Sequence, residues 1–275
     1  MIAARQIAFG KAAAKKEEPP AYWGLCFTAE EAGSTIKMNK VGSAPSVTLE
    51  TSFDCEIWEP FTVGETTITL PNVGDKVYFR AGEGGNTAMA SSINDYNNFS
   101  IITGRIAASG NIMSLLNGGS PDSIIATYCY SNMFNGCTAL VQAPELPATT
   151  LDTHCYSFMF NGCTSLAQAP KLPATTLAIS CYSNMFNGCT SLAQAPELPA
   201  TTLVTFCYNS MFNGCINIDC IKCSFKAFES DCTNNWLSVV SSTGTFICPT
   251  ALGTNETIQR GISYCPEGWT VINKD

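Results

Sequence analysis

MFNGCTSLAQAPELPATTL, residues 185–203, decides the fold of this 275-residue chain because the chain repeats it. Near copies occupy residues 133–151 and 159–177, and a fourth copy begins at Met211. The Cys-Tyr pairs that precede the copies start at positions 129, 155, 181 and 207, so the period is a constant 26 residues. Such regularity predicts one structural unit that is built four times.

Each repeat is predicted to form one coil of a stack. In CYSxMFNGC, Tyr and Phe stand four residues apart, which suits one face of a short helical turn, and Asn-Gly supplies the left-handed residue that ends it. TSLAQAP is long enough for a strand of about five residues before proline stops it. A period of about 20–29 residues with regular leucines is typical of a leucine-rich solenoid. One coil cannot bury its apolar side chains alone, so equivalent leucines should stack: Leu166, Leu172 and Leu177 on Leu192, Leu198 and Leu203.

The fifteen cysteines are an odd and high number, and eight of them fall into two columns of the repeat. The columns are Cys129, Cys155, Cys181 and Cys207, and Cys137, Cys163, Cys189 and Cys215. Free cysteine packs as a small apolar side chain, which favours buried thiols. The series Cys215, Cys220, Cys223 and Cys232 leaves a zinc site or a disulfide as alternatives.

Catalytic chemistry has few candidates in this sequence. The single histidine, His154, stands where the other repeats carry Tyr128, Ser180 and Phe206. A freely varied position is a poor place for a general base. Neither a phosphate-binding glycine loop nor a serine nucleophile motif is present. We therefore expect no enzymatic activity and no cofactor, and a zinc- or thiol-dependent enzyme is the weakest alternative.

Positions that vary inside the repeat are the candidate binding residues. In repeat binders the invariant positions hold the coil and the changing positions face outward, although neutral drift on an exposed face gives the same pattern. Glu145, Lys171 and Glu197, which stand one period apart, form a column of alternating charges in this set. The predicted binding face comprises Asn132, Phe158, Asn184, Glu145, Lys171, Glu197, Asp152, His154, Ile179, Ser180, Thr205 and Phe206.

Four segments are predicted along the chain. Residues 1–20 form a docking tail and linker, residues 21–112 a β-rich domain resembling a β-sandwich, residues 113–232 the repeat solenoid and residues 233–275 a C-terminal cap. Short β-rich runs at residues 23–28, 34–39, 53–58, 66–70 and 76–80 predict the strands of the second segment. Residues 82–98 are expected to form a long loop. Residues 234–240 suit a short helix within the cap region.

The N-terminal tail is predicted to be a docking peptide. A helix is expected over residues 2–16, with Ile2, Arg5, Ile7 and Phe9 as the anchoring side chains, because this patch suffices for a contact but is too small to fold alone. A frayed tail is the alternative. The apolar stretches are too broken for the h-region of a secretory signal. We therefore expect no secretory signal in this segment.

Charge and hydropathy limit the partners. The formal net charge of −8 and the absence of a strong basic cluster argue against nucleic acid. No apolar run approaches the roughly 20 residues that a membrane helix needs. The charged fraction is 13%, about half the usual value, so solubility depends on Thr, Ser and Asn.

The repeat resembles the BspA-like leucine-rich repeats, whose units carry an aromatic-x-x-Cys-x-x-Leu core and an LP turn. Phe160, Cys163 and Leu166 occupy those places, and the match covers roughly residues 124–223. The resemblance implies a non-enzymatic adhesion or recognition protein of bacterial surfaces, encoded in gut bacteria and their viruses. The secretion signal expected of a surface adhesin is not evident.

A protein of this kind without a secretion signal would reach the outside most simply inside a virus particle. We therefore expect a bacteriophage virion component, such as a head or tail fibre or decoration protein. Its expected partners are other virion proteins through the tail and a host surface protein or glycan through the repeats, with homo-oligomerisation possible. A bacterial cell-surface adhesin is the alternative. The expected location is the virion in the first case and the bacterial cell surface in the second.

Overall fold

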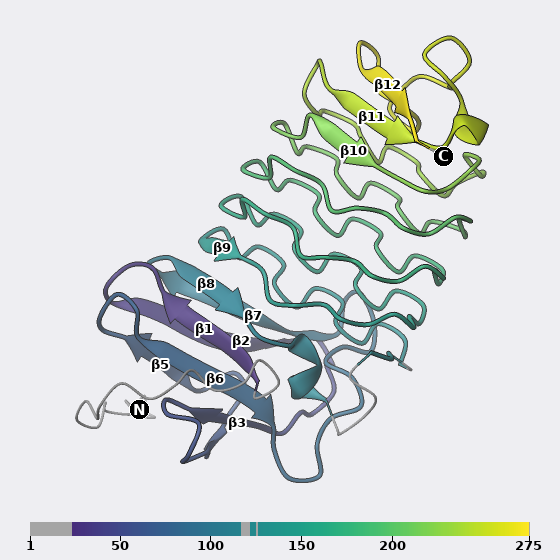
Figure 1. Cartoon of the computed structure of the whole chain (residues 1–275). Coiled ribbons are helices and arrows are strands. Elements are labelled where there is room, and N and C mark those ends of the chain that lie inside the picture. The colour runs from purple at the N-terminus through teal and green to yellow at the C-terminus, as the bar shows by residue number, and fades with distance from the viewer. Residues whose placement is uncertain (1–23, 117–121, 125, 275) are drawn as a thin grey trace.

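The computed structural model describes residues 24–116, 122–124 and 126–274, and within them the chain is β-rich (Figure 1). This confirms the predicted β-rich class. Two short 3-10 helices are the only helices in the described ranges. The elements are β1 Leu25–Ala29, β2 Ser34–Val41, β3 Leu49–Ser52, β4 Glu59–Phe61, β5 Thr67–Leu70, β6 Lys76–Ala81, β7 Tyr96–Thr103, β8 Ile106–Ser109, η1 Ile112–Leu115, β9 Leu140–Gln142, β10 Cys220–Lys222, β11 Thr245–Cys248, η2 Thr250–Leu252 and β12 Thr270–Asn273.

The N-terminal half contains two sheets. One has the strand order β4-β3-β6-β1-β8-β9 and the other has the order β5-β2-β7. Four of the predicted strands match β1, β2, β5 and β6. The strand expected at residues 53–58 is wrong, because Asp54 accepts hydrogen bonds from the backbone of Glu56 and Ile57 and Cys55 is left-handed (φ 63°). The predicted loop at 82–98 ends early because β7 begins at Tyr96.

Phenylalanines join the two sheets into one core. Phe27 of β1 lies 4.8 Å from Phe99 of β7, and Phe79 of β6 lies 5.1 Å from the same ring, measured between ring centroids. These rings are almost completely buried. Full burial of such a side chain contributes roughly 1.5–3 kcal/mol. The aromatic contacts therefore hold the sheets together.

The same core continues into the repeats. Phe99 stacks on Phe134 of the first repeat at 5.6 Å, and the Phe99 N–H donates to the Met133 carbonyl. Strand β8 pairs in parallel with β9, which belongs to that repeat. The sheets thus supply the surface that covers the first coil.

The repeat turns are not helical, so the predicted helical turn is wrong. In residues 128–137, alternate N–H groups donate to the carbonyl three residues back, as in successive β-turns. The intervening N–H groups donate to the carbonyl 25 residues ahead, in the next coil. Every fourth residue is left-handed: Tyr128, Asn132 and Gly136 have φ values of 56°, 61° and 76°. The left-handed glycine of the Asn-Gly pair is confirmed.

Strands within the repeats are shorter than expected. Strand β9 has three residues, and the equivalent segments of the second and third repeats meet in the single bridge Gln168–Gln194. Proline closes each segment, since it has no N–H to extend the pairing. Hydrogen bonds between the repeats are carried mainly by the turns.

The regular pairing continues through the C-terminal segment. Strands β10, β11 and β12 are parallel, and Cys220, Thr245 and Thr270 stand opposite one another at intervals of 25 residues. The helix expected at residues 234–240 is wrong, because Asn235 and Val239 are left-handed and continue the turn pattern. The strands at β1 and β12 lie at opposite ends of an elongated molecule (Figure 1).

Two sequence predictions concern the N-terminus and membranes. The helix and the four anchoring residues predicted within residues 1–20 lie outside the described residues. Across the described ranges, no helix combines the length and apolar character needed to cross a bilayer.

Candidate interaction face

The repeat turns present three rows of left-handed residues, which we call the turn face. The first row is Tyr128, His154, Ser180, Phe206 and Asp231; the second is Asn132, Phe158, Asn184, Ser210 and Asn235; the third is Gly136, Gly162, Gly188, Gly214 and Val239. Six of the twelve predicted binding residues fall in the first two rows.

The first and third rows share one backbone conformation but differ in side chain. Left-handed φ values cost an ordinary L-residue roughly 1–2 kcal/mol and cost glycine almost nothing. The third row uses glycine in four coils, whereas the first row places Tyr128, His154 and Phe206 at φ values of 56°. Bulky side chains at such positions are outliers that point to a functional role. The first row therefore keeps its aromatic groups despite a backbone cost that glycine would remove.

Two of these aromatic groups form a stacked pair. The rings of Tyr128 and His154 lie 4.6 Å apart at an interplanar angle of 7°. Burial lowers the pKa of His154 below its ordinary value. Its Nδ1 is buried and has no hydrogen-bond partner in the described part of the chain. The imidazole is thus favoured in its neutral form.

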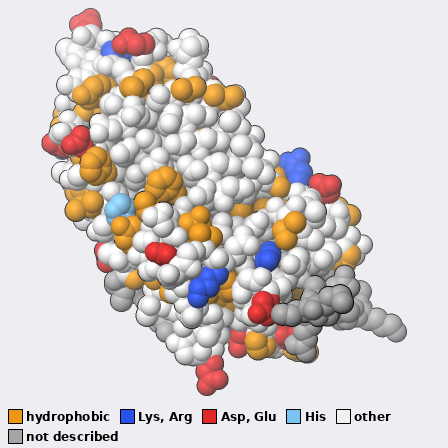
Figure 2. All heavy atoms as spheres, turned by 180° about the vertical axis from the view of Figure 1, so that it is seen from behind, with side chains coloured by type: hydrophobic (Ala, Val, Ile, Leu, Met, Phe, Trp, Pro, Cys, Tyr) orange, Lys and Arg blue, Asp and Glu red, His pale blue; other side chains and the backbone are white. Residues whose placement is uncertain are grey.

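Hydrophobic side chains surround the histidine on the surface. Figure 2 shows the single histidine, in pale blue, among hydrophobic groups on one side of the molecule. Ile179 is 49% exposed and Phe206 is 37% exposed. Ile93, from the loop before β7, is 43% exposed, and its carbonyl accepts a hydrogen bond from the Asn132 side chain. The face is therefore apolar and belongs to both halves of the chain.

Two expected binding residues are buried, so the inference that every varied position faces outward is wrong for them. Asn132 is 3% exposed and Ser180 is 4% exposed. Asn132 accepts from the amide of Asn135 and donates to Ser131, so it holds neighbouring turns together. Thr205 is exposed, whereas Asp152, Phe158 and Asn184 are half-buried.

The charged column lies apart from the turn face. It belongs to the segment that follows the short strand of each repeat, residues 144–151 in the first repeat, which we call the returning segment. Glu145, Lys171 and Glu197 are all exposed. Lys222, which is not among the predicted binding residues, extends the column and forms an ion pair with Glu197 at 2.9 Å. An exposed pair of this kind contributes little to stability.

Two other residues of the face were missed. Tyr128 occupies the varied column of His154 and was detectable from that alignment alone. Ile93 lies outside the repeats, and only the packing of its loop on the first coil brings it to the face. No periodic signal in the sequence marks it.

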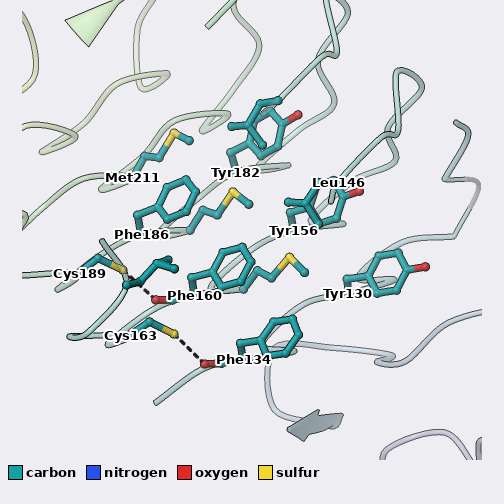
Figure 3. Packing of buried hydrophobic residues seen from close by; sticks show 14 of the residues in the cluster. Tyr130, Phe134, Leu146, Tyr156, Phe160, Cys163, Tyr182, Phe186, Cys189 and Met211 are labelled. Carbon is teal, nitrogen blue, oxygen red and sulfur yellow. Dashed lines mark hydrogen bonds between the residues drawn. The ribbon is translucent and has the colours of Figure 1, made fainter. Parts of the chain in front are cut away.

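Beneath the face, thiols link the coils. Cys137, Cys163, Cys189 and Cys215 each donate from Sγ to a phenylalanine carbonyl of the preceding layer, at 2.9–3.1 Å. Figure 3 shows the hydrogen bonds of Cys163 and Cys189. Burial raises the pKa of Cys137 and of Cys215 to about 12. The predicted burial of both cysteine columns is confirmed. The thiols act as hydrogen-bond donors inside the core.

Tyrosines and phenylalanines form parallel stacks beside the thiols. The rings of Phe134, Phe160 and Phe186 follow one another at 5.4 and 5.6 Å, and those of Tyr130, Tyr156 and Tyr182 at 5.9 Å (Figure 3). The Tyr130 hydroxyl donates to the Ile112 carbonyl at 3.1 Å. Among the described residues, the buried hydroxyls of Tyr156 and Tyr182 have no partner.

The cysteines of the zinc alternative take part in different contacts. Cys215 belongs to the thiol column, and the Cys223 N–H donates to the Ile247 carbonyl of β11. Within the described ranges, no group of three or more His, Cys, Asp or Glu side chains is arranged to hold a metal ion. The turn face is thus the most developed candidate site. No protein-family model, no curated protein and no solved structure matches this chain.

Proposed function

We propose that this chain is a non-enzymatic recognition protein whose repeats form a leucine-rich solenoid of the BspA-like kind. The stacking of Leu, Phe, Tyr and Cys at equivalent positions of successive coils supports the solenoid. Each coil then buries its apolar side chains only against its neighbours. The turn face is the recognition surface.

One observation carries the recognition role. The first row retains Tyr, His and Phe in a left-handed backbone conformation that disfavours them, while an adjacent row of the same turns uses glycine. Phe206 also remains substantially exposed, so burial within the fold does not fully account for it. A contact with a partner explains why such side chains are kept.

The chemistry of the face suits a neutral glycan on a host surface. Across residues 126–132, 152–158, 178–184 and 204–210, Asp152 is the single charged side chain. Together with Asp231 of the first row, these residues carry two carboxylates and neither Lys nor Arg, so the face offers nothing to a phosphate or an acidic polysaccharide. Aromatic rings pack on the apolar faces of sugars, and the half-buried side chains of Asn184 and Ser210 supply donors and acceptors for hydroxyl groups.

Serine substitutions test this role with little risk to the fold. Ser180 already occupies the first row at φ 54°, so Tyr128→Ser and Phe206→Ser place a residue that the repeat itself uses. Both variants should lose at least about tenfold in affinity for host cells or an array of neutral glycans, which corresponds to about 1.4 kcal/mol. Thr176→Ala, exposed outside the turns, is the control. Unchanged binding by both serine variants would contradict the assignment.

A virion is the proposed location. The thiol ladder needs reduced cysteines, and such thiols persist in the cytoplasm, where virus particles assemble, rather than in oxidising compartments. The elongated molecule also places β12 far from β1, which suits attachment at one end and recognition along the repeats (Figure 1).

Particle composition tests the virion assignment. Purified particles should contain the protein, and a variant lacking residues 1–18 should melt like the intact protein yet fail to enter particles. Detection on bacterial cell surfaces, with none in particles, would support the bacterial adhesin instead. Normal incorporation of the truncated protein would remove the anchoring role from Ile2, Arg5, Ile7 and Phe9.

A further inference from the structure

Among the described residues, no strand covers the outer edge of β12, the last strand of the sheet β10-β11-β12. Strand β12 pairs only with β11. The Thr270 N–H donates to the carbonyl of Gly244, the residue before β11, and the Lys274 N–H donates to the carbonyl of Cys248, the last residue of β11. In a parallel strand the alternate residues then direct their N–H and carbonyl groups away from the partner. In β12 these residues are Val271 and Asn273.

One side chain satisfies both outward groups of Val271. The Val271 N–H donates to Asn255 Oδ1 at 2.7 Å, and Asn255 Nδ2 donates to the Val271 carbonyl at 3.1 Å. A carboxamide offers the same donor and acceptor as a peptide group. Asn255 therefore takes the place that the backbone of a further coil would occupy.

The loop that carries Asn255 is held in place by short contacts. The Thr254 N–H donates to Thr257 Oγ1 at 2.9 Å, and the Ile258 N–H donates to the Thr254 carbonyl at 2.9 Å. A Cβ at Gly253 would approach Ile258 to 2.7 Å, so glycine is needed for this packing. Asn273 donates from its side chain to the Gly253 carbonyl at 2.8 Å. The loop is thus tied to the strand that it covers.

We infer that Asn255 is a cap that prevents a second copy of this chain from pairing with β12. The edge sequence Thr-Val-Ile-Asn favours strand pairing, and Ile272 is 44% exposed. Val271 offers both an outward donor and an outward acceptor. Two copies related by a two-fold axis would exchange both hydrogen bonds between their Val271 residues in an antiparallel pair. The uncapped edge is therefore complementary to itself.

Removal of the cap tests this inference. Asn255→Ala should sediment with a concentration-dependent mass that reaches twice that of the wild-type species. Ser263→Ala is the matched control, because it removes a hydrogen bond to the Asn235 N–H in the same end of the molecule without touching β12. The control should sediment like the wild type. Circular dichroism should give the wild-type spectrum for both variants.

A second substitution identifies the surface that associates. In Asn255→Ala with Ile272→Lys, each lysine would lie opposite Thr270 of the other copy and diagonal to the other lysine on the same face, within reach of long side chains, and like charges so placed disfavour pairing. The double variant should return to the wild-type mass. Wild-type mass for folded Asn255→Ala, with unchanged hydrogen exchange at the Val271 amide, would overturn the inference. Association of the double variant as strong as that of the single variant would also overturn it, since another surface would then be responsible.

Discussion

Tyr130 and Tyr156 occupy equivalent positions and are equally buried, but only one hydroxyl has a partner. Tyr130 donates to the Ile112 carbonyl, whereas the Tyr156 hydroxyl has no partner in the described part of the chain. A buried polar group without a hydrogen bond reduces stability by about 1–3 kcal/mol. The two tyrosines should therefore respond oppositely to loss of the hydroxyl.

Tyr156→Phe is expected to raise the free energy of unfolding by about 1 kcal/mol, and Tyr130→Phe to lower it by about 1 kcal/mol. Urea unfolding followed by circular dichroism measures both changes. The ring stack is unaltered in each variant, which makes each the control for the other. A greater loss for Tyr156→Phe than for Tyr130→Phe would show that the Tyr156 hydroxyl is bonded after all.

His154 should make stability depend on pH. Burial lowers its folded-state pKa below the unfolded value of about 6.5. The folded state thus favours the neutral ring, and this contribution is complete above the unfolded pKa. It is lost as the pH falls through the lowered folded pKa.

Thermal melts across this acidic range should show a loss of stability in the wild type that is smaller in His154→Ser. Because His154 is the single histidine, its ring resonances follow the titration directly by nuclear magnetic resonance. A titration midpoint above the ordinary value for histidine would contradict the prediction.

At the residue scale, sequence variation identified the rows but not the direction of each side chain. Phe206 of the first row and Ile179 beside it are exposed as expected, while Ser180 of the first row and Asn132 of the second are buried. Burial there depends on the size of the neighbours in adjacent coils. A single repeat does not contain that information.

At the element scale, spacing alone does not distinguish a helix from a chain of turns. Side chains four residues apart lie on one side in both arrangements, so Tyr156 and Phe160 fit either. The repeated left-handed residues decide the outcome, and Phe158 at φ 57° is not a residue that predicts this conformation. Gly162 does predict it, since glycine adopts a left-handed backbone at little cost.

Gly162 offers a test of the turn geometry. Its φ is 72°, and an added Cβ would lie 3.8 Å from Gly136, so space is available and the conformation alone is unfavourable. Gly162→Ala should lower the free energy of unfolding by about 1–2 kcal/mol. Gly162→Asn should lower it less, because asparagine tolerates a left-handed backbone.

Denaturant unfolding of both Gly162 variants measures the difference. The prediction reverses the order expected from size, since asparagine is the larger residue. If Gly162→Ala were the milder change, steric contact rather than backbone conformation would limit this position.

At the scale of the whole molecule, the chain has one continuous core. Phe99 from the sheets stacks on Phe134, and Tyr208 in the fourth repeat stacks on Trp236 beyond it. The sequence predicts the repeats from their period. It does not predict that β7 and β8 supply the layer before the first repeat, because those strands share neither the length nor the sequence motif of the repeat. The 25-residue register of β10, β11 and β12 was missed for the same reason.

Deletion of one complete repeat tests whether the coils are independent units. Removal of residues 159–184 deletes one full period and joins Phe158 to Met185, so the Phe, Tyr and Cys stacks stay in register. Stability in a stacked array is the sum of each unit and its contacts with neighbours. The shortened protein should therefore fold and unfold cooperatively, at a lower melting temperature than the intact chain. Removal of residues 159–171 places a returning segment over a turn, and this variant should show neither a cooperative melt nor the native circular dichroism spectrum. Equal failure of both deletions would mean that the coils stabilise one another only as a complete set.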